Sequence, residues 1–181
     1  MISNQHRITV TWAAALTLYA ACWFLPILEQ SSGRFVGYEG AKIAHLMFVE
    51  LVEKIFASKP RGLPNVFFVV FATIGWMANE LFVLGVCTVW IWPGIAIRFL
   101  AFSLGIMVSW QVYYAGEFPL LIGYWLWVAA GLIVLWLSAG RLAYRTKSSV
   151  LDVITNKITL SFLLFPILNA AAMRAVFDVK W

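Results

Sequence analysis

Charged residues are scarce in this chain, at 12% of its 181 residues, whereas hydrophobic residues make up 63%. An ordinary soluble domain carries about 25% charged and about 45–50% apolar residues. A water-soluble fold of this size could not bury so much apolar surface. The scarcity of charge therefore excludes an ordinary soluble domain and predicts an integral membrane protein, in which lipid covers the excess apolar surface.

The sequence also lacks the residue patterns of common catalytic and metal sites. Its two histidines, His6 and His45, stand alone, without an HExxH motif or a Cys/His cluster. No glycine-rich phosphate loop precedes a predicted helix. The cysteines, Cys22 and Cys87, fall toward opposite ends of separate predicted helices, so we expect both to be free. We expect no enzyme, no metal and no cofactor.

A net charge of +5 does not indicate nucleic-acid binding, because the basic residues are spread over several loops. We instead expect them to meet anionic lipid head groups at the inner face of the membrane. Arg141, Arg145 and Lys147 form the densest group and are a predicted lipid or partner contact. This group favours both chain ends inside, although the loop over 34–64 carries nearly as many basic residues.

Long apolar runs separated by turn-forming residues predict an all-α polytopic membrane protein with a four-helix transmembrane bundle. The predicted spans are 8–28, 74–92, 95–114 and 119–139. The first run lacks a small-x-small cleavage site, so we expect it to remain as a spanning helix. The run over 66–92 exceeds one upright span, so we expect its first part to be re-entrant or interfacial. We expect Gly140 to cap the last span.

Two amphipathic segments accompany the predicted bundle. Over 38–56, within the polar loop 34–64, apolar and polar side chains separate with a helical period, which predicts an interfacial helix. Residues 148–181 are predicted to form a C-terminal amphipathic tail outside a transmembrane domain over 1–147. Within the tail, 158–173 offers about 16 mostly apolar residues, short of the roughly 17–25 that a span needs. An interfacial or partner-facing helix is favoured, with a fifth span as the alternative.

An acidic residue within the second predicted span is the main candidate for a binding residue. Glu80 follows Asn79 and lies about 9 Å inside the predicted start of that span. Ionisable groups are costly inside a bilayer, so they usually face an interior or a cavity. Glu80 is therefore either part of an ion, proton or ligand site, or a carboxylate near the interface that is protonated or hydrogen-bonded to a neighbouring helix.

Arg98 and Gln111 complete the candidate binding set with Asn79 and Glu80. The helix rise separates Arg98 from Glu80 by about 12 Å in depth, so we expect Arg98 to reach the inner head groups and not to pair with Glu80. Gln111 on the third span lies closer to the level of Glu80.

Small residues recur at four-residue spacing on two predicted spans. The third span carries Ala101, Gly105 and Ser109, and the first span carries Ala13, Thr17 and Ala21. Such rows let helix backbones approach closely in a membrane. They predict either packing within the chain or self-association into a homo-oligomer.

Three short motifs resemble a pattern found in small bacterial inner-membrane proteins of four spans and unassigned function. The motifs are Gly37-Tyr38-Glu39, Asn79-Glu80-Leu81-Phe82 and Gly123-Tyr124-Trp125-Leu126-Trp127. The likeness covers about residues 8–140, and the position after Asn79, more often proline in that pattern, is Glu80 here. The resemblance implies a multi-pass topology in the bacterial inner membrane and supplies no mechanism.

These features favour a non-enzymatic membrane subunit, which acts as an oligomerising anchor, scaffold or sensor for a cytosolic or membrane protein partner. The general build is also similar to that of the membrane partner in Kiwa-type antiphage systems, which implies a role in bacterial defence. Two alternatives stay open. One is a small oligomeric ion channel or transporter with Glu80, Asn79 and Gln111 as a polar track, and the other is a membrane immunity protein against a pore-forming toxin.

Overall fold

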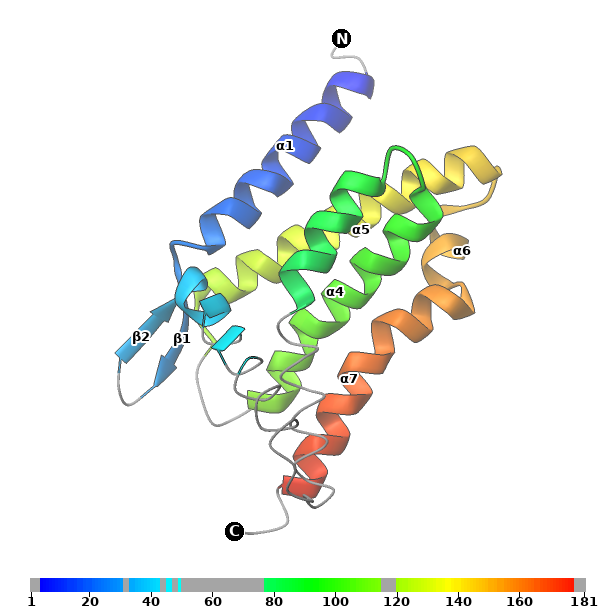
Figure 1. The fold of residues 1–181 in the computed structure, drawn as a ribbon. Helices are drawn as coiled ribbons and strands as arrows, with labels where there is room; N and C mark the ends of the chain where they lie inside the picture. The colour runs from blue at the N-terminus through cyan, green and yellow to red at the C-terminus, as the bar shows by residue number, and fades with distance from the viewer. Residues whose placement is uncertain are drawn as a thin grey trace.

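The computed structural model describes residues 4–30, 33–42, 45, 46, 49, 77–114 and 120–177, and within these ranges the chain is mostly helical (Figure 1). The long helices are α1 (Asn4–Cys22), α4 (Pro93–Tyr114), α5 (Ile122–Thr146) and α7 (Lys157–Phe177). The shorter elements are a helix over Met77–Thr88, the strands β1 (Pro26–Gln30) and β2 (Gly33–Val36), and α6 (Val150–Thr155). The prediction of a helical fold is confirmed, whereas the β1-β2 hairpin was not predicted.

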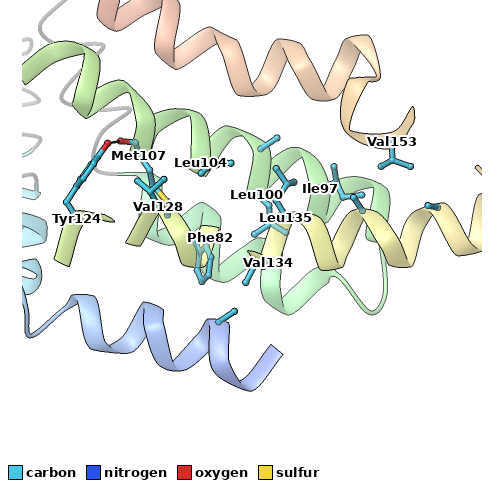
Figure 2. Packing of buried hydrophobic residues seen from close by; sticks show 14 residues of the cluster. Phe82, Ile97, Leu100, Leu104, Met107, Tyr124, Val128, Val134, Leu135 and Val153 are labelled. Atoms are coloured by element: carbon cyan, nitrogen blue, oxygen red, sulfur yellow. Dashed lines mark hydrogen bonds between the residues drawn. The ribbon is translucent and has the colours of Figure 1, made fainter. Parts of the chain in front are cut away.

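Helix α5 lies at the centre, where it packs against α1 on one side and α4 on the other. Figure 2 shows Leu100 of α4 beside Leu135 of α5 and Met107 of α4 beside Val128 of α5, in a cluster that includes Phe82 of the helix Met77–Thr88. Tyr124 of α5 donates a hydrogen bond from its hydroxyl group to the carbonyl oxygen of Met107, at 2.8 Å. The core is therefore formed jointly by α1, the helix Met77–Thr88, α4 and α5.

Helix α7 packs along the face of α4 opposite α5 (Figure 1). Gly105 lies directly against the backbone of α7, since a methyl group at this position would overlap the carbonyl oxygen of Leu163. Near the end of both helices, Arg174 donates from Nη1 to the carbonyl oxygen of Val112, at 3.0 Å. The apolar stretch over 158–173 is thus part of the bundle and not a detached tail.

The two predicted rows of small residues have different surroundings. On α4, Ala101, Gly105 and Ser109 are all buried within the chain. On α1, by contrast, Ala13 and Thr17 are exposed. The α4 row therefore serves packing inside the chain.

The predicted end of the first span is wrong. Helix α1 ends at Cys22, and the residues from Pro26 to Gln30 form β1, which pairs with β2 in antiparallel register. Pro26 has no backbone N–H to continue a helix, whereas the edge of a two-stranded sheet tolerates it. An ion pair of 3.2 Å between Glu29 and Arg34 joins the two strands.

The other predicted boundaries need correction as well. The second helix ends at Thr88 in place of residue 92, because 89–92 form the turn before Pro93, which opens α4. The prediction that Gly140 caps the last span is wrong. Helix α5 continues to Thr146 and ends at Lys147, whose left-handed backbone (φ 55°) directs its N–H to the carbonyl oxygen of Ala143.

Several predicted segments lie partly or wholly outside the described residues. They are the start of the second span at 74–76, the first residue of the last span, Pro119, and most of the interfacial helix over 38–56. Within 38–56, the described residues are helical. Helix α4 matches its predicted span closely, and Pro93 occupies the first helical position, which proline favours.

We expect Gly105→Ala to lower the free energy of unfolding, because its methyl group overlaps the backbone of α7 and forces α4 and α7 apart. Overpacking of this kind costs about 1–3 kcal/mol. Thermal unfolding of the purified protein measures the change. Gly94→Ala in the same helix is the matched control, since a methyl group there meets nothing within 4 Å. Equal unfolding temperatures for the two variants would contradict the packing described here.

Candidate functional site

An open cleft of about 810 Å³ lies between α1 and the helix Met77–Thr88, at the end of the bundle where the hairpin sits. Its lining is almost wholly aromatic and aliphatic, with two polar side chains among them. The residues that shape it are Tyr19, Trp23, Phe24, Tyr38, Asn79 and Glu80. A single carboxylate within apolar walls is the chemical signature of the site.

Tyr19 forms one wall of the cleft and fixes the two helices relative to each other. Its ring stacks on Phe82 with centroids 4.1 Å apart, and it forms a T-shaped contact with the ring of Trp23, with centroids 6.3 Å apart. Its hydroxyl group donates to Oδ1 of Asn79, at 3.0 Å. The residue next to Asn79 is Glu80, so the bond from Tyr19 holds the backbone that presents the carboxylate.

Tyr38 reaches the cleft because the chain after β2 passes very close to the end of α1. At Gly37, any side chain would overlap the carbonyl oxygen of Cys22, so only glycine allows this approach. The N–H of Tyr38 then donates to the carbonyl oxygen of Trp23, at 3.0 Å. One residue further, the carboxylate of Glu39 accepts a bond from the N–H of Val36, at 3.0 Å.

Glu80 is exposed and faces the cleft, as do the exposed side chains of Val83 and Leu84 one turn further along the same helix. Within the described part of the chain, no salt bridge involves Glu80. Its neighbour Asn79 differs, because Asn79 is half-buried and its oxygen accepts the bond from Tyr19. The carboxylate of Glu80 is thus available to a ligand.

The structure brings together only two of the four predicted binding residues. Asn79 and Glu80 both line the cleft. Arg98 is exposed on the first part of α4, toward the opposite end of the bundle, and does not line the cleft. Gln111 lies near the other end of α4, with a buried Oε1 that has no hydrogen-bond partner. The predicted polar track from Glu80 to Gln111 is therefore not formed by the described residues of the cleft.

The opposite end of the bundle carries the predicted basic contact. The guanidinium group of Arg141 lies over the ring of Trp90, 3.7 Å from its centroid, in a cation–π contact. Arg145 donates to the carbonyl oxygen of the same tryptophan, at 3.3 Å. Both arginines therefore hold the turn at 89–92 against the end of α5, whereas Lys147 is exposed.

The acidic residue Asp152 partly offsets the positive charge at this end of the bundle. Ser149 and Asp152 form a capping box at the start of α6, with reciprocal backbone bonds of 3.0 and 3.1 Å. Hydrogen bonds from Ser149 stabilise the charged carboxylate and lower the pKa of Asp152 below its ordinary value. Asp152 thus stays charged beside the exposed lysines Lys147 and Lys157.

The described residues offer little for covalent or metal chemistry. Among them, no group of three or more His, Cys, Asp or Glu side chains could hold a metal ion. Cys22 and Cys87 are both free thiols, and the buried thiol of Cys22 donates a hydrogen bond to the carbonyl oxygen of Tyr19. Among the described residues that line the cleft, Glu80 offers a carboxylate, Asn79 an amide, and Tyr19 and Tyr38 hydroxyl groups.

Comparison of the chain with protein-family models, with curated proteins and with solved structures finds no match. The resemblance to small bacterial inner-membrane proteins therefore stays an expectation from the three motifs. Sequence reasoning missed Tyr19, Trp23 and Tyr38 as parts of the site. Only Tyr38 stood in one of those motifs, whereas the other two belong to an apolar run that gives no such signal.

We expect Tyr19→Phe to lower the free energy of unfolding by about 1 kcal/mol, because it removes the hydrogen bond to Asn79 and leaves the ring in place. Chemical unfolding of the purified protein measures this. Tyr38→Phe is the control, since Tyr38 is exposed on the same cleft and its hydroxyl group has no described partner. If both substitutions had the same effect, the bond between α1 and the helix Met77–Thr88 would carry no stability.

Proposed function

We propose that the chain is a multi-pass protein of the bacterial inner membrane and acts there as a non-enzymatic anchor for a partner protein. The observation that carries this proposal is the apolar outer face of its helices. On α5, Trp125, Leu132 and Trp136 lie on one side of the helix and expose between 50% and 56% of their surface. Water would disfavour such a continuous apolar face, whereas hydrocarbon would not.

Helix α7 has the same character. Its exposed side chains Ile158, Phe162, Phe165 and Leu168 recur at helical spacing along one face. Its basic residues, Lys157 and Arg174, stand at its two ends. This distribution fits a helix whose middle lies in hydrocarbon and whose ends reach the head groups.

Within the described residues, two helices are long and apolar enough to cross a membrane, namely α4 over Pro93–Val112 and α5 over Ile122–Thr146. Shorter apolar helices cover Ile8–Cys22, Met77–Thr88 and Lys157–Ala172. Because these helices pack lengthwise against α4 and α5, we propose that they share the same membrane. In this arrangement α7 is a further span beyond the four of the initial prediction.

The charge distribution supports an orientation. The end of α5 and the start of α7 carry Arg141, Arg145, Lys147 and Lys157, against the single acidic residue Asp152. At the hairpin end, basic and acidic residues are mixed, with Glu29, Arg34, Glu39 and Lys42. By the positive-inside rule, the excess of basic residues supports the first end as the cytoplasmic one. Since α1 begins at this end and α7 finishes at the other, we propose that the start of α1 is cytoplasmic and the end of α7 lies on the opposite side, in place of an arrangement with both chain ends inside (Figure 1).

We expect new cysteines at the two ends to be labelled from opposite sides of the membrane. Ser148→Cys marks the basic end and Arg34→Cys marks the hairpin, both at exposed positions. Cys22→Ala and Cys87→Ser supply the cysteine-free background. An impermeant maleimide should label Arg34→Cys in intact spheroplasts and Ser148→Cys only after lysis. Labelling of both from one side would contradict the topology, and extraction of the protein by alkaline carbonate would contradict membrane insertion.

A partner protein would meet the cytoplasmic end. Tyr144 and Leu151 expose 88% and 63% of their surface there, beside Lys147. Apolar side chains among basic residues at the edge of the hydrocarbon core are suited to a protein contact, in which they become buried while the lysines meet acidic groups. This surface replaces the C-terminal tail as the proposed contact, because α7 is occupied by α4.

We expect a photo-cross-linking amino acid in place of Tyr144 to form a specific protein adduct in cells. The same amino acid in place of Trp136, which faces outward from the middle of α5, should label lipid and not that protein. Lys147→Glu should weaken the adduct, because it reverses the charge beside the contact. Mass spectrometry of the adducts measures both effects. Identical adducts from the two positions would contradict a partner at the cytoplasmic end.

A further inference from the structure

The cleft contains a carboxylate, that of Glu80, with no described basic partner. Glu80 is an exposed carboxylate on the outer face of a helix, and no described side chain forms a salt bridge with it. If the chain lies in a membrane, as proposed above, such a group is costly unless a cation or a hydrogen-bond donor meets it. An occupant of the cleft that carries positive charge would supply that partner.

The depth of Glu80 limits what this occupant can be. Tyr19, which bonds its neighbour Asn79, lies in the last turn of α1, and Trp23 follows just after that helix. Tyrosine and tryptophan favour the boundary between hydrocarbon and head groups. Glu80 is therefore placed at the level of the outer head groups and not at the middle of the bilayer. A lipid head group reaches this level without leaving the membrane.

The chemistry of the walls matches one kind of head group. Tyr19, Trp23 and Tyr38 line the same cleft as Glu80. Aromatic rings attract an ammonium group through cation–π contacts. The carboxylate accepts charge-assisted hydrogen bonds, which a primary ammonium group can donate. A phosphoglycerol head group has no positive charge to offer here.

The direction of the cleft matches the lipid as well. From Glu80 the helix runs toward the turn at 89–92, that is, toward the cytoplasmic end. Val83 and Leu84 line the cleft in this direction and are exposed. The carboxylate thus stands at the outer level with apolar side chains below it, which is the order of head group and acyl chain in the outer leaflet.

We propose that this cleft binds an outer-leaflet phospholipid with a primary ammonium head group, held by Glu80 and the aromatic rings, with an acyl chain along Val83 and Leu84. The proposal rests on the membrane location proposed above. It gives the cleft an occupant of defined chemistry and assigns Glu80 as the residue that selects the head group.

Native mass spectrometry of the detergent-purified chain tests this with phosphatidylethanolamine, phosphatidylcholine and phosphatidylglycerol of identical acyl chains. We expect phosphatidylethanolamine to be retained most strongly. Glu80→Gln should reduce its retention about tenfold, to the level of phosphatidylglycerol, because one charge-assisted contact is lost. Glu29→Gln is the matched control, since this carboxylate lies at the same end of the bundle and is paired with Arg34.

Unchanged retention in Glu80→Gln, or equal retention of phosphatidylglycerol by the unaltered chain, would overturn the proposal. So would a change of oligomeric state in Glu80→Gln without a change in bound lipid, since a second copy of the chain would then cover the cleft. Circular dichroism verifies that the variant is folded. Carbonate extraction of the unaltered chain distinguishes failure of this inference from failure of the proposed membrane location. A protein that stays in the membrane but shows no Glu80-dependent lipid binding contradicts this inference alone.

Discussion

Hydrogen bonds from hydroxyl groups on one helix to acceptors on a neighbouring helix hold this bundle together. Ser103 of α4 donates to the carbonyl oxygen of Ala78, at 2.7 Å, and Tyr124 of α5 donates to that of Met107, at 2.8 Å. Tyr19 of α1 makes the third such bond, to the side chain of Asn79. In lipid, apolar surfaces gain nothing by leaving hydrocarbon, so helix association depends on close packing and on bonds of this kind. The remaining features of the fold are arranged around these contacts.

The two ends of the bundle use polar residues in different ways. At the hairpin end, Tyr19 and Asn79 satisfy each other and leave the carboxylate of Glu80 facing the cleft. At the basic end, Arg141 and Arg145 are engaged with Trp90, which leaves Lys147 exposed. At each end, polar side chains that stabilise the fold lie beside a charged side chain that is exposed. This separation identifies Glu80 and Lys147 as the residues to examine for binding.

The sequence predicted the elements that local chemistry determines. Helix α4 could be predicted almost to its ends because Pro93 and Gly94 punctuate its start and an apolar run of spanning length follows. The ends of α1 and α5 could not, since pairing of β1 with β2 shortens one helix and contacts with Trp90 accompany the extension of the other. The position of α7 was also beyond sequence reasoning. An almost uniformly apolar helix has no face that indicates its neighbour, and the contact of Gly105 with Leu163 joins distant segments.

The same limit applies to the site. A carboxylate and an amide within an apolar run indicated Asn79 and Glu80, because burial of such groups in lipid is costly. The rings around them come from α1 and from the chain after β2, and nothing in their own segments indicates a cleft. Tyr38 reaches it only because Gly37 passes against Cys22. The site is thus a product of tertiary structure around a residue that the sequence singled out.

The helix Met77–Thr88 connects the two ends directly. It carries Glu80 in the cleft, and the turn that follows it carries Trp90 beneath Arg141 and Arg145. A sensor requires a ligand site and a partner site that bear on one rigid element, because coupling passes through contiguous packed structure. A channel would instead require polar groups along a continuous path, and Gln111 does not join Glu80 in the cleft. The arrangement of the described residues is the reason to propose an anchor or sensor in place of a pore.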